Sequence, residues 1–273
     1  MKTFSTLVPF VIALAAAPLH ASSISINTGS LGAAANGTDA TGVTFASGPL
    51  GSGGDQAAFY AGVGVTTIVP FNSGVNPSSS SPFSIEFWAY PTAFDNDDSP
   101  VSNRISSGNR SGWAFFQRGS ATGWNLRMYN GTGSEVGWDL TGGTSNLFEW
   151  SHVVATWNGS AAKLYVNGVL VDDINDTNRT PGYNASTTGN FIVGATDSGS
   201  PYNGGIDEVA LYGSELTPAQ IASHFAAAPG SAAAYQALVR ADGARLQLSN
   251  VPEPTAAALL GLGALTLTRR RRA

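Results

Sequence analysis

The chain has 273 residues and a formal net charge of −5, and charged residues make up only 11% of it, against about 25% in typical globular domains. Basic residues cluster only at the extreme C-terminus, which disfavours nucleic acid as a partner. The chain contains no cysteine, so a disulfide framework is excluded, and its 33 glycines are typical of an exported all-β protein with many turns.

The first 21 residues have the pattern of a secretory signal peptide. Lys2 supplies a positive start, Leu7 to Ala17 form an apolar run, and Ala21 places a small residue at the cut. The alternative is a buried first helix. Residues 22–53 follow, and we assign them to an N-terminal strand and loop. Ser23 to Ile26 alternates polar and apolar residues and predicts a short edge strand, with a long loop after it.

The middle of the chain predicts a series of short strands separated by glycine-rich turns. In residues 83–91, Phe83, Ile85 and Phe87 alternate with polar or outward positions, as in a strand with one face in a core. Because no helices alternate with these strands, a parallel sheet is excluded and a sandwich or barrel is favoured. The strands expected before residue 148 are 56–60, 65–69, 83–91, 113–117, 124–129 and 136–140.

The stretch from Phe148 to Val171 predicts three consecutive antiparallel strands. Trp150 to Trp157 is rich in β-branched and aromatic residues, and Lys163 to Val166 alternates. Asn167-Gly168 between them and the next apolar run is typical of a two-residue type I′ hairpin turn. Further strands are expected at 191–194 and 206–211, and a capping-box pattern at Thr217 predicts a helix through about Ala227.

Several of these stretches carry a family resemblance. WSHVVATWNG followed by KLYVNG, together with FSIEFWAYP, FIVGA and GIDEVALY in that order, resembles the LamG-like jelly rolls of the concanavalin A-like lectin/glucanase superfamily. The resemblance covers residues 54–228. It implies an all-β, two-sheet antiparallel jelly-roll sandwich with one short C-terminal helix. Residues 229–250 resemble a segment that precedes such domains in tandem arrays, and we interpret them as a spacer.

The C-terminal residues 251–273 have three parts. The triplet Pro252, Glu253 and Pro254 is followed by an apolar span, 255–268, and a basic tail, Arg269, Arg270, Arg271 and Arg272. Fourteen residues reach about 21 Å as a helix, less than the ~30 Å hydrocarbon core of a bilayer. The arrangement resembles the PEP-CTERM sorting signal, recognised by exosortase-type enzymes of Gram-negative bacteria. It implies transient inner-membrane insertion, C-terminal processing and display at the cell surface or in an extracellular matrix. The alternative is an ordinary membrane tail.

Catalytic patterns are missing from the sequence. Retaining glycoside hydrolysis needs two carboxyl groups about 5–5.5 Å apart, and glycanases of the superfamily carry them at alternate positions of one strand. None of the six glutamates has a carboxylate two positions away. Asp207 and Glu208 are adjacent, so in a regular strand they point to opposite faces. His152 is interpreted as a packed strand residue, and no phosphate loop or Cys/His metal spacing is present. We therefore expect no enzyme activity.

Two kinds of binding residue remain. The resemblance implies a structural calcium near the first and last strands, with Asp207 and Asp55 at the matching positions; alternatively Asp207 only hydrogen-bonds neighbouring backbone. Sugar rings pack on exposed aromatic faces, and Trp113, Trp124 and Trp138 lie in turn-flanked strands where we expect exposure. Alternatively these three tryptophans belong to the core.

These observations predict an exported, non-catalytic domain that binds an extracellular glycan or a surface protein. One alternative is a structural or adhesive matrix protein that binds no small ligand. Another is a glycan-cleaving enzyme, which the missing carboxylate pair disfavours.

Overall fold

The computed structural model describes residues 24–50, 55–94 and 97–249. The expected signal peptide, residues 1–21, lies outside the described residues, as do the sorting triplet Pro252 to Pro254, the apolar span and the tail Arg269 to Arg272. Within the described ranges no helix has the length and apolar character needed to cross a membrane.

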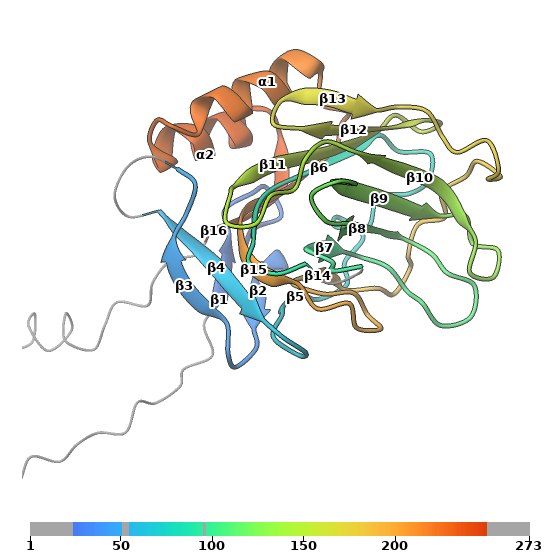
Figure 1. Cartoon of the computed structure of the whole chain (residues 1–273), viewed down its shortest axis with the longest axis horizontal. Helices are drawn as coiled ribbons and strands as arrows, with labels where there is room; N and C mark the ends of the chain where they lie inside the picture. Colours follow the sequence, from blue (N-terminus) through green and yellow to red (C-terminus); the bar gives the residue numbers. More distant parts are fainter. Residues whose placement is uncertain (1–23, 51–54, 95–96, 250–273) are drawn as a thin grey trace, which may run out of the picture.

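Sixteen strands, one 3-10 helix and two α-helices form in the described part of the chain (Figure 1). The strands up to residue 102 are β1 (Ile24–Asn27), β2 (Gly37–Asp39), β3 (Thr44–Ser47), β4 (Gln56–Ala61), β5 (Thr67–Val69), β6 (Phe83–Pro91) and β7 (Val101–Ser102). The later strands are β8 (Trp113–Gln117), β9 (Trp124–Tyr129), β10 (Val136–Gly142), β11 (Ser151–Trp157), β12 (Ala162–Val166), β13 (Val169–Asp172), β14 (Phe191–Val193), β15 (Asn203–Tyr212) and β16 (Ala244–Ser249). The helices are η1 (Gly32–Ala35), α1 (Pro218–Ala227) and α2 (Ala232–Ala241).

The strands form two antiparallel layers. One layer, the front sheet, has the order β10-β9-β8-β7-β14-β5-β2-β1; the other, the back sheet, has the order β16-β15-β6-β11-β12-β13, with the β3–β4 hairpin added at β15. Strand β1 pairs with β2 in the front sheet and with β16 in the back sheet. The result is a nearly closed antiparallel sandwich, which confirms the all-β jelly-roll prediction. The prediction that β1 is an edge strand is wrong, because it joins the two layers.

The meander after Phe148 is confirmed. Val153 pairs with Val166 across β11 and β12, and Val166 pairs with Val169 across the hairpin. Asn167 and Gly168 have φ angles of 51° and 78°, as a type I′ turn requires. The alternation in β6 also holds, because Phe83, Ile85 and Phe87 lie in the core between the two sheets.

Residues 229–249 are part of the fold, so the prediction that residues 229–250 form a spacer is wrong. They form helix α2 and strand β16, and β16 inserts between β15 and β1. Leu246 and Leu248 of β16 are buried in the core between the sheets. The expected capping box at Thr217 starts α1. The sequence predicted a single C-terminal helix, and the structure adds a second one, α2.

Helices α1 and α2 cover part of the outer face of the back sheet, where a second buried cluster forms. Trp88 of β6 stacks on Phe225 of α1 with ring centroids 5.9 Å apart. Beside it Glu86 is fully buried. Its Oε1 accepts hydrogen bonds from His152 Nε2 (2.8 Å) and Tyr235 OH (2.5 Å). Four protein donors converge on Glu86, so one carboxylate joins the sheet to both helices.

The other Glu86 oxygen completes the network. Oε2 accepts from Tyr212 OH at 2.7 Å and from His224 Nδ1 at 2.8 Å, and His224 Nε2 contacts Asp242 Oδ2 at 2.8 Å. Burial alone would raise the pKa of Glu86, but the hydrogen bonds from His152 and His224 hold it well below its ordinary value. Burial would lower the pKa of His224, but Glu86 and then Asp242 raise it. The network therefore favours a charged Glu86.

Candidate functional site

Three carboxylates form a cluster beside the back sheet. Asp55, Asp207 and Glu208 each place an oxygen within 4.8 Å of the others. Asp207 and Glu208 are buried, whereas Asp55 is half-buried. Leu50 N donates to Asp55 Oδ2 at 2.8 Å, and Glu208 N donates to Asp207 Oδ1 at 2.9 Å. Asp207 Oδ2 is buried, and a side-chain hydrogen bond links Asp207 to Asp55.

Burial and neighbouring charge raise the pKa values of all three carboxyls in the cluster. Burial, the charge of Glu208 and then that of Asp55 raise the pKa of Asp207 well above its ordinary range, and burial raises the pKa of Glu208 to about 7. Burial likewise raises the pKa of Asp55. Calcium takes oxygen ligands at 2.3–2.6 Å, so oxygens within 4.8 Å of one another can share one ion. The donor set therefore fits a hard divalent cation.

The chain passes close to this cluster at a glycine, Gly48. A Cβ added at Gly48 would lie 2.2 Å from Asp55 Oδ2 and 2.3 Å from Asp207 Oδ2. Such distances are far inside van der Waals contact, so any side chain at this position displaces the carboxylates. The backbone of Gly48 thus forms one wall of the cluster.

A β-bulge explains why Glu208 joins the cluster. Asp207 pairs with Trp88 and Ala210 with Glu86, so β15 carries one extra residue opposite β6. Glu208 adopts a φ of 48°, a left-handed conformation that is uncommon outside glycine. The prediction that Asp207 and Glu208 point to opposite faces is therefore wrong. Gln236 Nε2 of α2 donates to Glu208 Oε1 at 2.6 Å and holds it in place.

The expected tryptophan binding platform is contradicted. Trp113 and Trp124 are fully buried and Trp138 is 7% exposed, and all three lie in the core between the sheets. Trp113 packs edge-on against Phe115 and Phe191, so its ring is used for packing. These strands alternate inward and outward residues, and the tryptophans take the inward positions. The outward positions carry the polar residues described next.

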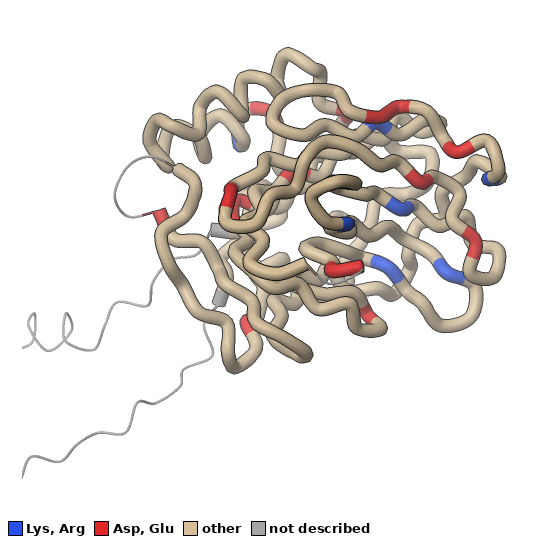
Figure 2. Tube along the Cα trace, in the orientation of Figure 1, with Lys and Arg blue, Asp and Glu red and all other residues tan. Residues whose placement is uncertain are grey.

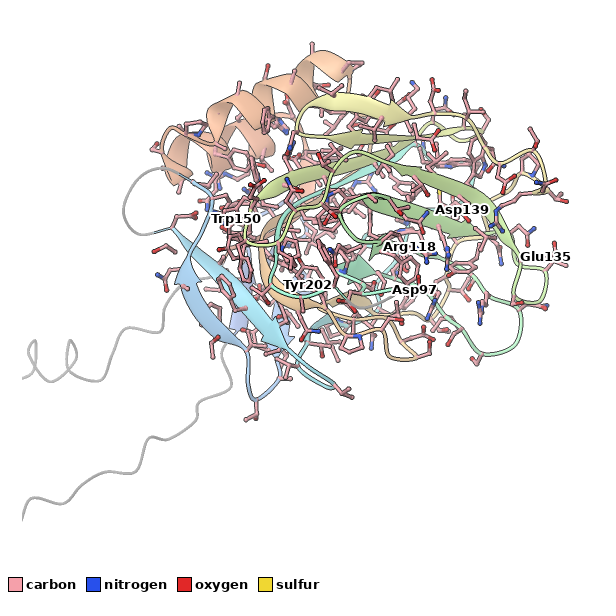
Figure 3. The ribbon with its side chains drawn as sticks, viewed as in Figure 1. Asp97, Arg118, Glu135, Asp139, Trp150 and Tyr202 are labelled. Atoms are coloured by element: carbon pink, nitrogen blue, oxygen red, sulfur yellow. The ribbon has the colours of Figure 1, made fainter. Side chains whose placement is uncertain are left out.

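The outer face of the front sheet holds a polar surface pocket of about 380 Å³, called here the front pocket. Its lining residues, all polar or charged, are Arg118, Thr122, Asn125, Asp139, Thr141 and Asp176. Asp139 of β10 and Arg118 lie on the same side of the molecule in Figure 3. Asp139 Oδ2 accepts a hydrogen bond from Arg179 at 2.5 Å. No sequence motif marks these residues as a site.

Asn125 forms the floor of the front pocket and is 1% exposed. Its Nδ2 donates to Asp139 Oδ1 at 2.6 Å, to Leu140 O at 2.9 Å and to Thr141 Oγ1 at 2.9 Å. Since the carboxylate and the backbone carbonyl only accept, the amide nitrogen must face them. Asn125 Oδ1 is buried and has no hydrogen-bond partner in the described structure. Asn125 therefore holds Asp139 and Thr141 in place at the floor of the pocket.

Cations gather around the front pocket. Eight lysines and arginines lie in the described part of the chain, and five of them surround strands β7 to β10, intermixed with carboxylates as Figure 2 shows. These five are Arg104, Arg110, Arg118, Arg127 and Arg179. The guanidinium of Arg127 lies 4.9 Å from the ring centre of Phe116. Arg118 pairs with Asp97, and Arg179 pairs with Asp139 and Asp176. Both of these arginines are therefore already paired with carboxylates.

Comparisons with known proteins agree with this fold. Residues 63–222 match the family model of the concanavalin A-like lectin/glucanases superfamily, and residues 250–272 match the PEP-CTERM protein-sorting motif. The chain belongs to the concanavalin A-like lectin/glucanases superfamily. Its sorting motif indicates export and localisation at the cell surface or outside the cell after C-terminal processing. A motif of this class implies processing by an exosortase-type system.

Solved structures show the same architecture at low sequence identity. Domain 4 of AbnA, an extracellular arabinanase of Geobacillus stearothermophilus in complex with arabinotriose, is 20% identical with a TM-score of 0.51, over 67% of this chain and 81% of that one. The binding domain of Paraclostridial Mosquitocidal Protein 1 is 17% identical with a TM-score of 0.55, over 74% of this chain and 52% of that one. At these identities the likeness shows the fold alone. No curated protein matches this chain.

Proposed function

We propose that this exported protein is a non-catalytic carbohydrate-binding module that recognises sugar hydroxyls in the front pocket. The observation that carries the proposal is a surface pocket of about 380 Å³ that is lined wholly by polar and charged side chains. The arabinotriose bound to the similar arabinanase domain supports a sugar as the ligand class.

The ligand class is a neutral sugar. Arg118 and Arg179 are already paired with carboxylates, so a negatively charged ligand would compete with Asp97, Asp139 and Asp176 for them. Paired guanidinium and carboxylate groups still have free donors and acceptors, which match the alternating hydroxyls of a pyranose or furanose. Binding should therefore depend weakly on salt, because it brings no net charge together.

The absence of catalysis is part of the same proposal. Both Asp139 oxygens accept hydrogen bonds from protein donors, Asn125 and Arg179, so the carboxylate is engaged in holding the pocket. Glu86 is fully buried under the helices and cannot reach a substrate. A general acid must instead lie within hydrogen-bond reach of the bond it cleaves.

The acidic cluster supports a structural role for calcium. We infer that Asp55, Asp207 and Glu208 would hold the ion and that it would fix the segment at Gly48 to the bulge of β15. The convergence of three carboxylate oxygens within 4.8 Å of one another and the raised pKa of each carboxyl are the observations behind this inference. A bound cation would favour the charged carboxylates and so would remove the cost of burying them.

A glycan array probed with the exported protein tests the proposed function. Neutral oligosaccharides should bind, and Asp139→Asn should weaken binding about tenfold or more, because a hydrogen bond to a charged group is lost. Asp173→Asn is the matched control, since Asp173 is exposed and lies outside the pocket. Release of reducing ends from a bound glycan would show an enzyme. Self-association without any glycan binding would favour the structural matrix protein.

A further inference from the structure

The outer face of the back sheet has two halves, and only one is covered by the helices. Beyond the helices, Tyr90 of β6 contacts three aromatic rings from other segments. Its ring centre lies 5.2 Å from that of Trp150, 6.1 Å from that of Phe59 of β4 and 6.3 Å from that of Phe148. We call Phe59, Tyr90, Phe148 and Trp150 the aromatic platform. None of these four side chains is buried, although Trp150 packs partly against the helix-covered cluster.

Trp150 differs from the other tryptophans. Five of the six are buried, whereas Trp150 is partly exposed. Its neighbour in the platform floor is Gly205 of β15, where an added Cβ would lie 2.8 Å from Phe59 Cζ and 3.0 Å from Trp150 Cη2. The rings of Phe59 and Trp150 therefore lie directly over the glycine backbone. A residue with a side chain at Gly205 would push them apart, so the floor of the platform is built to hold two rings side by side.

Phe148 is held in an unfavourable conformation in solvent. Its side chain is 61% exposed and its φ is 63°, while its N–H donates to Pro91 O at 2.8 Å. Left-handed backbone is uncommon for a bulky residue, and asparagine or glycine adopts it more readily. The packing of the core gives no reason for phenylalanine here. A strained backbone that keeps an apolar ring in water points to a binding role.

Polar groups flank the exposed ring in sequence. Asn146 Nδ2 donates to Glu149 Oε2 at 2.8 Å, and both side chains are exposed. An amide and a carboxylate beside aromatic faces match a ligand with an apolar C–H face and a hydroxyl-bearing edge, as a pyranose ring has. A hydrophobic protein partner or an acyl chain would leave this carboxylate buried without compensation.

We propose that the aromatic platform is a second carbohydrate site, which stacks the C–H face of a neutral pyranose on Trp150 and Phe148. Figure 3 places Trp150 and Asp139 on opposite sides of the molecule, so the platform is separate from the front pocket. The platform itself does not depend on the front pocket. Where both sites bind, a consequence that rests on the proposed function, one molecule joins two polysaccharide chains.

Tryptophan emission of the exported protein, titrated with cellohexaose, mannohexaose and xylohexaose, tests the platform. Because the other five tryptophans are buried, a ligand-dependent change should come mainly from Trp150, and Trp150→Phe should reduce it. Phe148→Asn should weaken binding about tenfold with an unchanged or higher melting temperature, because asparagine accepts the left-handed backbone. Phe71→Asn, an exposed phenylalanine outside the platform, is the matched control and should change neither binding nor emission.

The outcomes separate the two sites. Asp139→Asn should leave the Trp150 response intact, so loss of the response in that variant alone would assign the signal to the front pocket and overturn the platform. No emission change with any of the three hexasaccharides, or unchanged binding in Phe148→Asn, would also overturn it. A concentration-dependent dimer that Phe148→Asn dissolves would show instead that a second copy covers these rings. If Phe148→Asn abolishes the emission response and Asp139→Asn does not, the platform is supported, whether or not the front pocket binds a glycan.

Discussion

Replacing Glu86 by glutamine should strongly destabilise the fold. The change keeps the size of the side chain but removes its charge, and it turns an acceptor of four hydrogen bonds into a group with a donor on one side. That donor would face either His152 and Tyr235 or His224 and Tyr212. Removing one partner of a buried charged network typically costs about 3–5 kcal/mol. For a domain of this size that loss lowers the melting temperature by roughly 6–20 °C.

The pH dependence gives this prediction a second readout. Because the folded-state pKa of Glu86 is below its ordinary value of 4.5, its contribution to stability is present above about pH 4.5 and is lost as the pH falls. Because the folded-state pKa of His224 is above 6.5, its contribution is present below about pH 6.5 and is lost as the pH rises. The network should therefore stabilise the fold most between these values, and Glu86→Gln should flatten that maximum.

Urea unfolding of the exported protein, followed across this pH range, measures both effects. Glu135→Gln is the matched control, since Glu135 is exposed at a turn, and it should change the free energy of unfolding by no more than about 0.5 kcal/mol. If Glu86→Gln loses less than about 1 kcal/mol and keeps the wild-type pH profile, the carboxylate is not the charged centre that joins the helices to the sheet.

Three further outcomes are expected. With a chelator present, the free energy of unfolding should fall as the pH rises from about 5 to 7, because the pKa of Glu208 is raised from 4.5 to about 7 and its folded-state proton is lost over that range. Calcium at ~100-fold above its Kd should restore about 2.7 kcal/mol at pH 7, and Gly48→Ala or Asp207→Asn should abolish that gain. Identical melting curves with calcium and with chelator would exclude the site. Leu246→Ala should lower the free energy of unfolding, measured in urea, by about 2–5 kcal/mol, because Leu246 is fully buried. A loss near zero would support the prediction that residues 229–250 are a spacer. Intact-mass measurement of the exported protein should show loss of the chain near and beyond Pro252, and recovery of a surface protein that still carries Arg269 to Arg272 would contradict C-terminal processing.

The sequence predicts those features that depend on local pattern. The Asn167-Gly168 turn, the alternation in β6 and the capping box at Thr217 each follow from a few neighbouring residues, and each is found where expected. Strands β2 and β3 lie in a stretch rich in glycine, alanine, serine and threonine, whose composition favours no element, and long-range pairing with β5 and β4 makes them strands.

The candidate sites were harder to predict because they depend on contacts between distant segments. Glu86 stands among apolar residues in the sequence, yet its partners come from β11, β15, α1 and α2. A bulge cannot be predicted from the letters Asp207-Glu208, although it decides that both carboxylates meet Asp55. Likewise, nothing local marks Trp150 as the tryptophan whose ring stays partly open. For Trp113, Trp124 and Trp138, the alternation of each strand was the available signal that the rings face inward.

The position of β16 has a mechanical consequence. This last strand is hydrogen-bonded on both sides, Leu248 pairing with Val209 of β15 and with Asn27 of β1. The chain continues directly from its end towards the sorting motif, and β1 begins beside that same end. A load applied at Ser249 along the strand axis therefore pulls β16 along its own length. Backbone hydrogen bonds in an antiparallel sheet lie perpendicular to the strands, so such a load acts on all of them together in shear. The hydrogen bonds to both β15 and β1 must break before β16 is pulled out of the sheet.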